Sequence, residues 1–372
     1  MRRGFKGPEA SAVGFAQREN SPLGPQFQEL REDILEHVQR LFPELPSNVP
    51  LKFRPIAVWG THEMGVVEAG NSPVRRLFMK GPRKDGRKWM GLEVEHRILT
   101  EVAPKISAQN PLTRCPSVVA YYPDREILLL EMVEGAPLHR LLFGWNCPRD
   151  SQSLGEYLRL SGEWLARFHG LTRSERVGNP FEWLVNEFES IPTRSAFEQY
   201  AGLRTYRAVR DLADRFRREQ RSLKKSLCGI HGAFTPGHVF VQDGRIYVID
   251  LESSRMGYAY EDLAYFTARY DMFYPWRRDA EGKRIDLDGQ RDLFLKGYVA
   301  HASPLGAVEG LIIHLARFLS MLRIVRRKGP PKQPVTKSRG PKFWWRRFWL
   351  RYRFGVLCRQ ELRALQDATK DF

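Results

Sequence analysis

The stretch CGIHGAFTPGHVFVQDGRIYVIDLE, residues 228–252, carries the clearest structural signal in the chain. Two apolar runs flank Asp243-Gly244, and Asp-Gly between such runs favours a tight β-hairpin. Residues 231–238, just before the hairpin, are rich in Gly and Pro and indicate a loop. Asp250 comes directly after the second apolar run, so we expect its carboxylate and the loop side chains to converge. A carboxylate in that position suits the binding of Mg²⁺ between phosphate oxygens.

Short strands precede this stretch, and helices lie on both sides of it. Apolar residues spaced three to four apart predict an amphipathic helix over residues 26–41. The next part predicts a small antiparallel sheet with one helix inserted, with strands at 55–59, 65–68, 74–79, 117–122 and 127–131 and the helix at 89–102. After a break at residues 135–137, helical spacing dominates at 154–171, at 197–223 and from 260 onward. The chain is therefore expected to be α+β, with the sheet first and mainly helices after it.

Composition and cysteine spacing limit the class of protein. The chain has 372 residues, 42% of them hydrophobic, which suffices for one large two-lobed domain or two ordinary domains. Its four cysteines lie far apart without a C-x-x-C pair, which argues against a zinc site or a disulfide framework and favours a reducing compartment. No secretory signal is apparent, and no apolar run reaches the roughly 18 residues of a membrane span. We therefore expect a cytoplasmic protein.

The loop before the hairpin resembles the catalytic loop of the aminoglycoside phosphotransferase and choline kinase-like family, whose pattern is H-G-D-x-x-x-x-N followed by I-D. His231-Gly232 matches this pattern, and the filling at residues 234–236 is typical of the family. Asp250 falls where the family has its second metal-binding Asp. His231 is expected to support the loop through hydrogen bonds. Further similarity lies in LARFHGL at 165–171, in LLEMVEG at 129–135, in Glu252 and in residues 262–264.

The resemblance covers roughly residues 50 to 325 and implies a two-lobed protein kinase-like fold. It implies a nucleotide-binding N-lobe with a small antiparallel sheet over 49–134, and a mainly helical C-lobe with the catalytic loop and acceptor site over 135–327. A basic aromatic linker and helix would follow over 328–372. Composition and apolar spacing predict a tail and helix over 1–48. Outside the loop itself, we expect His169 to be an ordinary helix residue with satisfied hydrogen bonds, and Asp262 to cap or brace the helix that begins near it.

The resemblance further implies ATP and Mg²⁺ as cofactors and a small molecule or glycan as the phosphate acceptor. In the family a strand Lys contacts the nucleotide phosphates and pairs with a helix Glu. Lys80 is the candidate Lys, and Glu95 is the preferred partner with Glu93 as the second choice. Glu131 and Val133 would offer backbone hydrogen bonds to an adenine. From spacing alone, Lys80 could equally be an exposed strand-end lysine and Glu95 a solvated helix residue.

Two positions of the catalytic loop depart from the family pattern. Ala233 replaces the Asp that accepts the proton of the substrate hydroxyl, and loss of such a base costs about 10²- to 10⁴-fold in rate. Three explanations stay open: a natural pseudoenzyme, another base such as Glu252 or a substrate carboxylate, or an engineered change. His238 replaces the metal-binding Asn, so the candidate metal ligands are Asp250 and His238. An imidazole suits Mg²⁺ poorly because Mg²⁺ prefers oxygen ligands.

The net charge of +17 is concentrated near the C-terminus. Residues 311–360 hold 14 Lys and Arg and no Asp or Glu, so the remainder of the chain carries only +3. The sequence KFWWRRFWLRYRF at 342–354 would form a helix with one aromatic face bordered by arginines. This face would pack on the large lobe, or residues 342–358 would contact a membrane surface or a lipid-linked substrate. Nucleic acid is the least favoured partner, since no recognised module accompanies the aromatic and basic residues.

Three functions therefore remain, the third being a lipid- or polyanion-binding surface protein whose nucleotide pocket is vestigial. The first is ATP-dependent phosphate transfer to a hydroxyl, impaired by Ala233. The alternative is a pseudokinase scaffold or regulator, peripheral at the membrane or bound to a partner through the basic C-terminal helix.

Overall fold

The computed structural model describes residues 23–56, 62–70, 74–83, 91–143, 151–190, 203–273, 287–328 and 341–368. The chain divides into two compact units. Unit 1 comprises Met1–Glu101 and Pro116–Glu134, and unit 2 comprises Val102–Cys115 and Gly135–Phe372.

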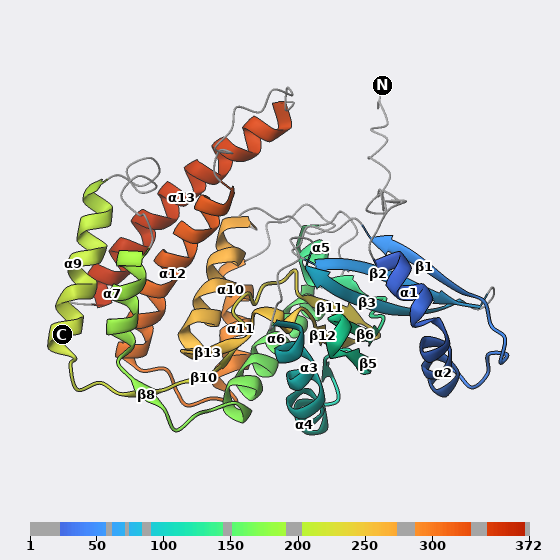
Figure 1. Ribbon diagram of the computed structural model, residues 1–372. Helices are drawn as coiled ribbons and strands as arrows, with labels where there is room; N and C mark the ends of the chain where they lie inside the picture. Colours follow the sequence, from blue (N-terminus) through green and yellow to red (C-terminus); the bar gives the residue numbers. More distant parts are fainter. Residues whose placement is uncertain are drawn as a thin grey trace. The chain divides into compact units, whose positions relative to one another are not determined.

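Unit 1 is built on a five-stranded antiparallel sheet with the order β1-β2-β3-β6-β5 (Figure 1). The strands are β1 (Leu51–Ile56), β2 (His62–Ala69), β3 (Arg75–Arg83), β5 (Val118–Tyr122) and β6 (Ile127–Glu131). β2, β3, β5 and β6 lie where the sequence predicts strands. β1 begins at Leu51 and shares only residues 55 and 56 with the strand predicted at 55–59, of which residues 57–59 lie outside the described residues. A short 3-10 helix, η2 (Pro123–Arg125), joins β5 to β6.

Two helices cover this sheet, α1 (Leu23–Glu29) and α2 (Arg31–Leu41). Their buried side chains, among them Phe27, Ile34 and Val38, pack with strand residues such as Val67 and Leu129 in one apolar core. The single helix predicted over residues 26–41 is wrong in one respect, because the helix is interrupted at Leu30. Leu30 is itself buried in the same core, so the apolar spacing continues across the break and conceals it.

The predicted helix at 89–102 is confirmed from residue 91 onward, as α3 (Gly91–Arg97) followed by a π-helix, η1 (Ile98–Val102). A further helix in unit 2, α4 (Ala103–Gln109), begins with Pro at its second position. Proline is tolerated there because the first turn of a helix leaves its N–H groups unbonded in any case.

Unit 2 is mainly helical, as the spacing after residue 137 predicts (Figure 1). Its longer helices are α6 (Ser151–Leu171), α7 (Pro180–Ser190), α9 (Leu203–Glu219), α10 (Ala259–Phe273), α11 (Leu287–Val299), α12 (Ala307–Lys328) and α13 (Pro341–Ala368), and the short α5 (Leu138–Phe143) precedes them. Five buried aromatic rings form the centre of this unit: Trp164, Phe168, Phe234, Phe266 and Phe294. Their stacked contacts, with ring centroids 4.0 to 5.7 Å apart, join α6, α10, α11 and the loop of residues 231–238.

The predicted hairpin is confirmed as β11 (Val239–Gln242) and β12 (Arg245–Val248). Asp243 and Gly244 have φ angles of +50° and +72°, the left-handed conformation that a two-residue hairpin turn requires. Very short strands flank the hairpin, β4 (Thr113–Arg114) beside β12 and β7 (Ala136–Pro137) beside β11. Two further pairs are β10 (Cys228–Ile230) with β13 (Arg255–Gly257) and β8 (Val177–Gly178) with β9 (Lys225–Ser226).

The C-terminal helix α13 belongs to unit 2. Phe354, Leu357, Cys358 and Leu365 are buried on it. The side chains of residues 341–352, where the basic and aromatic residues gather, lie outside the described set. Over the described stretches, every helix is too short or too polar to cross a membrane.

Candidate functional site

Unit 1 contributes a buried ion pair. Lys80 Nζ on β3 lies 2.8 Å from Glu95 Oε2 on α3, and both side chains are 3% exposed. Lys80 lies inside β3, opposite Leu128 of β6, rather than at the end of a strand. The alternative of an exposed lysine and a solvated glutamate is therefore wrong. Glu93, the second candidate partner, is exposed.

The segment after β6 holds the two residues expected to face an adenine. The backbone N–H of Glu131 donates to the carbonyl of Ser117, 3.0 Å away, and the Glu131 carboxylate accepts a hydrogen bond from the Ser117 hydroxyl. The N–H of Glu131 is thus already engaged within the sheet. Val133 follows the end of β6 and is half-buried.

In unit 2 the loop of residues 231–238 is held closely against its surroundings. Gly232 has φ +76°, and a Cβ placed there would lie 2.5 Å from the carbonyl oxygen of Ser253, so only glycine fits. The ring of His231 is fully buried, and its Nε2 lies 3.2 Å from the carbonyl oxygen of Ile249. The ring of the adjacent Phe234 is buried in the aromatic core. The residues on both sides of Ala233, Gly232 and Phe234, are therefore held in place by their packing.

The strongest anchor of this loop is Asp262, on the first turn of α10. Its carboxylate accepts hydrogen bonds from the backbone N–H groups of His231 at 2.7 Å and Gly232 at 2.9 Å. Of the expectation that Asp262 caps or braces its own helix, only the capping part is wrong, because its carboxylate bonds to the loop and Glu261 accepts the hydrogen bond from the N–H of Tyr258 at the start of α10. The sequence offers no direct signal for the role of Asp262, since the bonds span 30 residues or more along the chain.

The carboxylate of Asp262 also contacts His169 on α6. His169 Nε2 lies 3.2 Å from Asp262 Oδ2, and its Nδ1 lies 3.1 Å from the hydroxyl of Tyr298 on α11. His169 is therefore a satisfied helix residue, as expected. Burial alone would raise the pKa of the Asp262 carboxyl, but the hydrogen bond and charge of His169 hold that pKa below its ordinary value.

Helices α6 and α11 approach closely, which lets His169 and Tyr298 meet. A Cβ on Gly162 would lie 2.0 Å from the carbonyl oxygen of Phe294, and one on Gly297 would lie 2.0 Å from that of Arg159. Any larger side chain at either position would separate the two helices.

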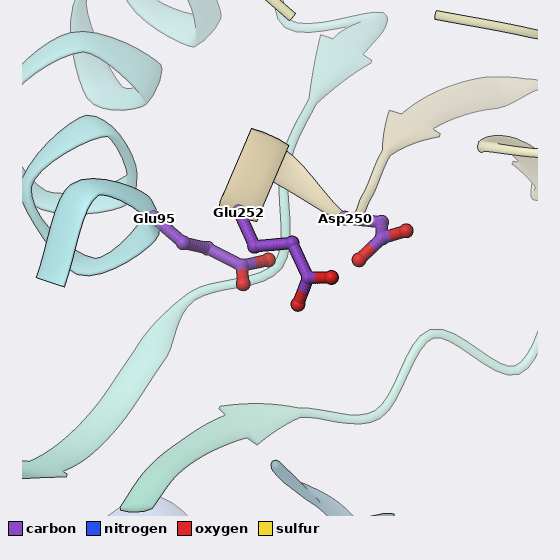
Figure 2. A group of neighbouring side chains, drawn as sticks. All are labelled: Glu95, Asp250 and Glu252. Carbon is purple, nitrogen blue, oxygen red and sulfur yellow. The ribbon is translucent and has the colours of Figure 1, made fainter. Parts of the chain in front are cut away.

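Asp250 and His238 meet at the end of the hairpin. His238 Nε2 lies 3.7 Å from Asp250 Oδ2. Asp250 has φ +66° and precedes the short 3-10 helix η3 (Leu251–Ser253), which carries Glu252. Asp250 and Glu252 each place a carboxylate oxygen within 4.8 Å of the other, and Figure 2 shows both side chains leaving the chain on the same side.

A comparison with family models matches residues 66–303 to the phosphotransferase enzyme family. This chain belongs to the phosphotransferase enzyme family. The segments already described, from β2 through α11, lie within the matched range. A search of curated proteins found no match.

Solved structures show the same fold at low sequence identity. A "putative aminoglycoside phosphotransferase" from Ralstonia eutropha JMP134 is 13% identical, covers 88% of this chain and 98% of its own, and has a TM-score of 0.52. Amicoumacin kinase hAmiN in complex with AMP-PNP, Ca²⁺ and Ami is 13% identical, covers 87% and 96%, and has a TM-score of 0.50. The predicted α+β, two-lobed kinase-like fold is confirmed.

The phosphotransferase family implies a divalent metal such as Mg²⁺. The carboxylates of Asp250 and Glu252 suit Mg²⁺, which takes oxygen ligands. The imidazole of His238, 3.7 Å from the carboxylate of Asp250, is a nitrogen donor and suits Zn²⁺ or other transition ions better. The donor set of this loop therefore does not fit Mg²⁺ well.

Proposed function

We propose that this protein binds a nucleotide such as ATP through Lys80 of unit 1, and that its transfer of phosphate to a hydroxyl is strongly impaired. The observation that supports nucleotide binding is the buried pair of Lys80 and Glu95, 2.8 Å apart. A buried ion pair is weak evidence for stability, because apolar side chains of similar volume would stabilise the fold at least as well. Its presence is better explained by a ligand that needs the lysine charge.

The impairment follows from the loop in unit 2. Transfer from ATP forms a bond between the acceptor oxygen and the γ-phosphorus, breaks the bond from that phosphorus to ADP, and releases the hydroxyl proton. A base must take that proton, and the methyl group of Ala233 cannot. Losing a positioned base costs about 10²- to 10⁴-fold in rate. The acceptor class we propose is a hydroxyl of a small molecule or glycan.

Thermal unfolding with and without ATP tests nucleotide binding. A ligand at 100 times its Kd stabilises the folded state by about 2.7 kcal/mol, so wild-type protein should unfold at a higher temperature with ATP. The informative variant is the double change Lys80→Met with Glu95→Leu, which removes both charges and retains the buried volume. This variant should fold and lose the ATP-dependent shift, whereas the control Lys52→Met, at an exposed position of β1, should keep it. An unchanged shift in the double variant would refute the assignment of Lys80.

A non-catalytic scaffold is the second candidate. It is favoured by the hydrogen bonds that hold the loop. His231 bonds to Asp262 and to the carbonyl of Ile249, so the loop is ordered although position 233 lacks a carboxylate. Docking of such a scaffold to a membrane surface through residues 342–358 is a further proposal. Co-sedimentation with vesicles of phosphatidylserine, compared between the full chain and Arg346→Glu with Arg347→Glu, would test it.

A further inference from the structure

We propose that the exposed side of α9 and of the turn after it, in unit 2, binds the surface of an anionic lipid membrane by electrostatic attraction. This surface, the α9 basic face, consists of four exposed residues: Arg207, Arg218, Arg221 and Lys224. Neither nucleotide binding by Lys80 nor docking through residues 342–358 is needed for this binding, which goes beyond the proposed function.

The apolar side of α9 is already packed inside unit 2. Val209, Ala213 and Phe216, spaced three to four residues apart, are at most 1% exposed. The ring of Phe216 stacks on that of Phe181 of α7, with ring centroids 5.6 Å apart. Because its apolar side chains are buried, α9 cannot insert them into a bilayer as a free amphipathic helix does. Only its charged side is available to a partner.

The charged side is strongly basic. Residues 203–225 hold nine Lys and Arg against three Asp and Glu, a net charge of +6. Each of the three acids pairs with an arginine of the same helix: Asp211 with Arg210 at 3.4 Å, Asp214 with Arg217 at 3.0 Å and Glu219 with Arg215 at 2.6 Å. In the part of the chain that the structure describes, no carboxylate forms an ion pair with the α9 basic face. Its charge is therefore available to an outside partner.

The spacing of the basic residues suits an extended anionic surface. Arg207 and Arg218 are eleven positions apart in the sequence, about three helical turns, so they lie on the same side of α9. The rise of the helix separates their Cα atoms by about 16 Å. Cations spread over such a length meet several headgroups of a membrane at once, whereas one small anion would meet only one or two of them.

The two neighbouring helices differ in charge. α9 packs against α7 and α13, which lie beside it in Figure 1. The described part of α13 has the exposed residues Arg359 and Arg363, whereas α7 has the exposed residues Glu182 and Glu189. The basic surface therefore continues on the side of α13 and is limited on the side of α7.

Nucleic acid is the alternative polyanion, and a plain solvated face is the simplest alternative. Proteins hold single strands with aromatic side chains on which the bases stack. The described part of α9 exposes no aromatic ring, because Phe216 is buried and Tyr206 is half-buried. A face that only keeps the protein in solution predicts no membrane binding. Near an anionic leaflet, by contrast, each Lys or Arg strengthens binding by about fivefold.

Co-sedimentation of the full chain with vesicles, without nucleotide, tests the α9 basic face. Wild-type protein should bind vesicles that contain phosphatidylserine far more than vesicles of phosphatidylcholine alone, and high salt should weaken this binding because it screens charge. Arg207→Gln with Arg218→Gln removes two positive charges and should lower the partition coefficient by about 25-fold. Asp211→Asn removes an exposed negative charge from the same helix and should raise the partition coefficient.

The matched control is Arg31→Gln with Arg97→Gln, the same change of charge at two exposed arginines of unit 1, and it should bind as wild type does. Circular dichroism would verify that each variant is folded. Because Asp211→Asn is expected to gain binding, a poorly folded double variant of α9 would not leave the question open.

Three results would overturn the assignment of the α9 basic face. Equal partition of wild type and the double variant of α9 would assign any membrane binding to residues 342–358, which every variant retains. An equal loss in the double variant and in the unit 1 control would mean that net charge alone drives binding. A double variant that binds vesicles normally but loses binding to a single-stranded RNA oligonucleotide would assign the face to nucleic acid. The stabilisation by ATP should be the same in all these proteins, so its absence would reject only the proposed function.

Discussion

Asp262 accepts a hydrogen bond from the backbone N–H of Gly232 at 2.9 Å, so helix α10 holds the loop at the residue immediately before Ala233. The same carboxylate binds the N–H of His231 and is 1% exposed. The backbone at position 233 is therefore kept in place although the side chain expected there is missing. Mutations of Asp262 and of Ala233 test the two sides of this relationship separately.

Removing the anchor should destabilise the protein. Asp262→Ala leaves the backbone N–H groups of His231 and Gly232, and the ring of His169, without their acceptor, and breaking a buried charged network of this kind costs about 3–5 kcal/mol. Urea unfolding would measure the loss. The control Asp124→Ala removes an exposed carboxylate in η2 and should change stability by less than about 0.5 kcal/mol. Similar losses for both variants would contradict the role assigned to Asp262.

The contribution of Asp262 should also depend on pH. Because its pKa in the folded protein is lower than in the unfolded chain, the stabilisation is present in full above the unfolded value of about 3.9 and is lost as pH falls through the folded pKa. The difference in unfolding free energy between wild type and Asp262→Asn should therefore be constant near neutral pH and shrink below about pH 4. A difference that stays constant or grows in acid would be inconsistent with a lowered pKa.

Restoring a carboxylate at position 233 should restore catalysis. In Ala233→Asp we expect the rate of phosphate transfer from ATP to a hydroxyl acceptor to rise by about 10²- to 10⁴-fold, the usual contribution of a positioned base. Release of ADP across a panel of small-molecule and glycan hydroxyls would measure it. Ala233→Asn is the matched control, since an amide of the same shape cannot take the proton. If ATP binds and the Asp and Asn variants are equally inactive on every acceptor, the scaffold function is favoured instead.

Helix α13 should depend on Arg317 of α12 for its attachment. Arg317 forms ion pairs with Asp271 of α10 and, at 2.7 Å, with Glu361 of α13, and all three residues are buried. Arg317→Met would leave both carboxylates without this partner and should cost about 3–5 kcal/mol. We expect hydrogen exchange in residues 353–368 to accelerate. Arg363→Met, at an exposed position of α13, serves as the control and should exchange as wild type does.

Much of the fold was predictable because its signals are local. The hairpin is specified by Asp243-Gly244 between apolar runs, and α6 is specified by apolar spacing over a long stretch. The break at Leu30 was not predictable, since the apolar stripe continues through it. Strands of two or three residues, such as β4 and β7, are too short to show any periodicity, and they exist only because β11 and β12 pair with them.

The sequence likewise predicts some features of the candidate site, whereas others depend on the tertiary structure. The family resemblance predicts that Lys80 and Glu95 form a pair. Only the structure shows that both are buried and in contact, because burial depends on neighbours distant in sequence. His238 and Asp250 were both candidates for the metal, and their separation of 3.7 Å depends on how the loop and the hairpin turn.

The amino-acid sequence by itself determined the order of strands and helices, the hairpin turn and the presence of Ala233 rather than a carboxylate in the loop, since each depends on residue type and short spacing. Only the tertiary structure decided that Asp262 anchors the loop rather than its own helix, and that His169 and Tyr298 support it from two other helices. These bonds join residues between 30 and 129 positions apart. Contacts of that kind form only when the helices pack, so no local pattern in the chain encodes them.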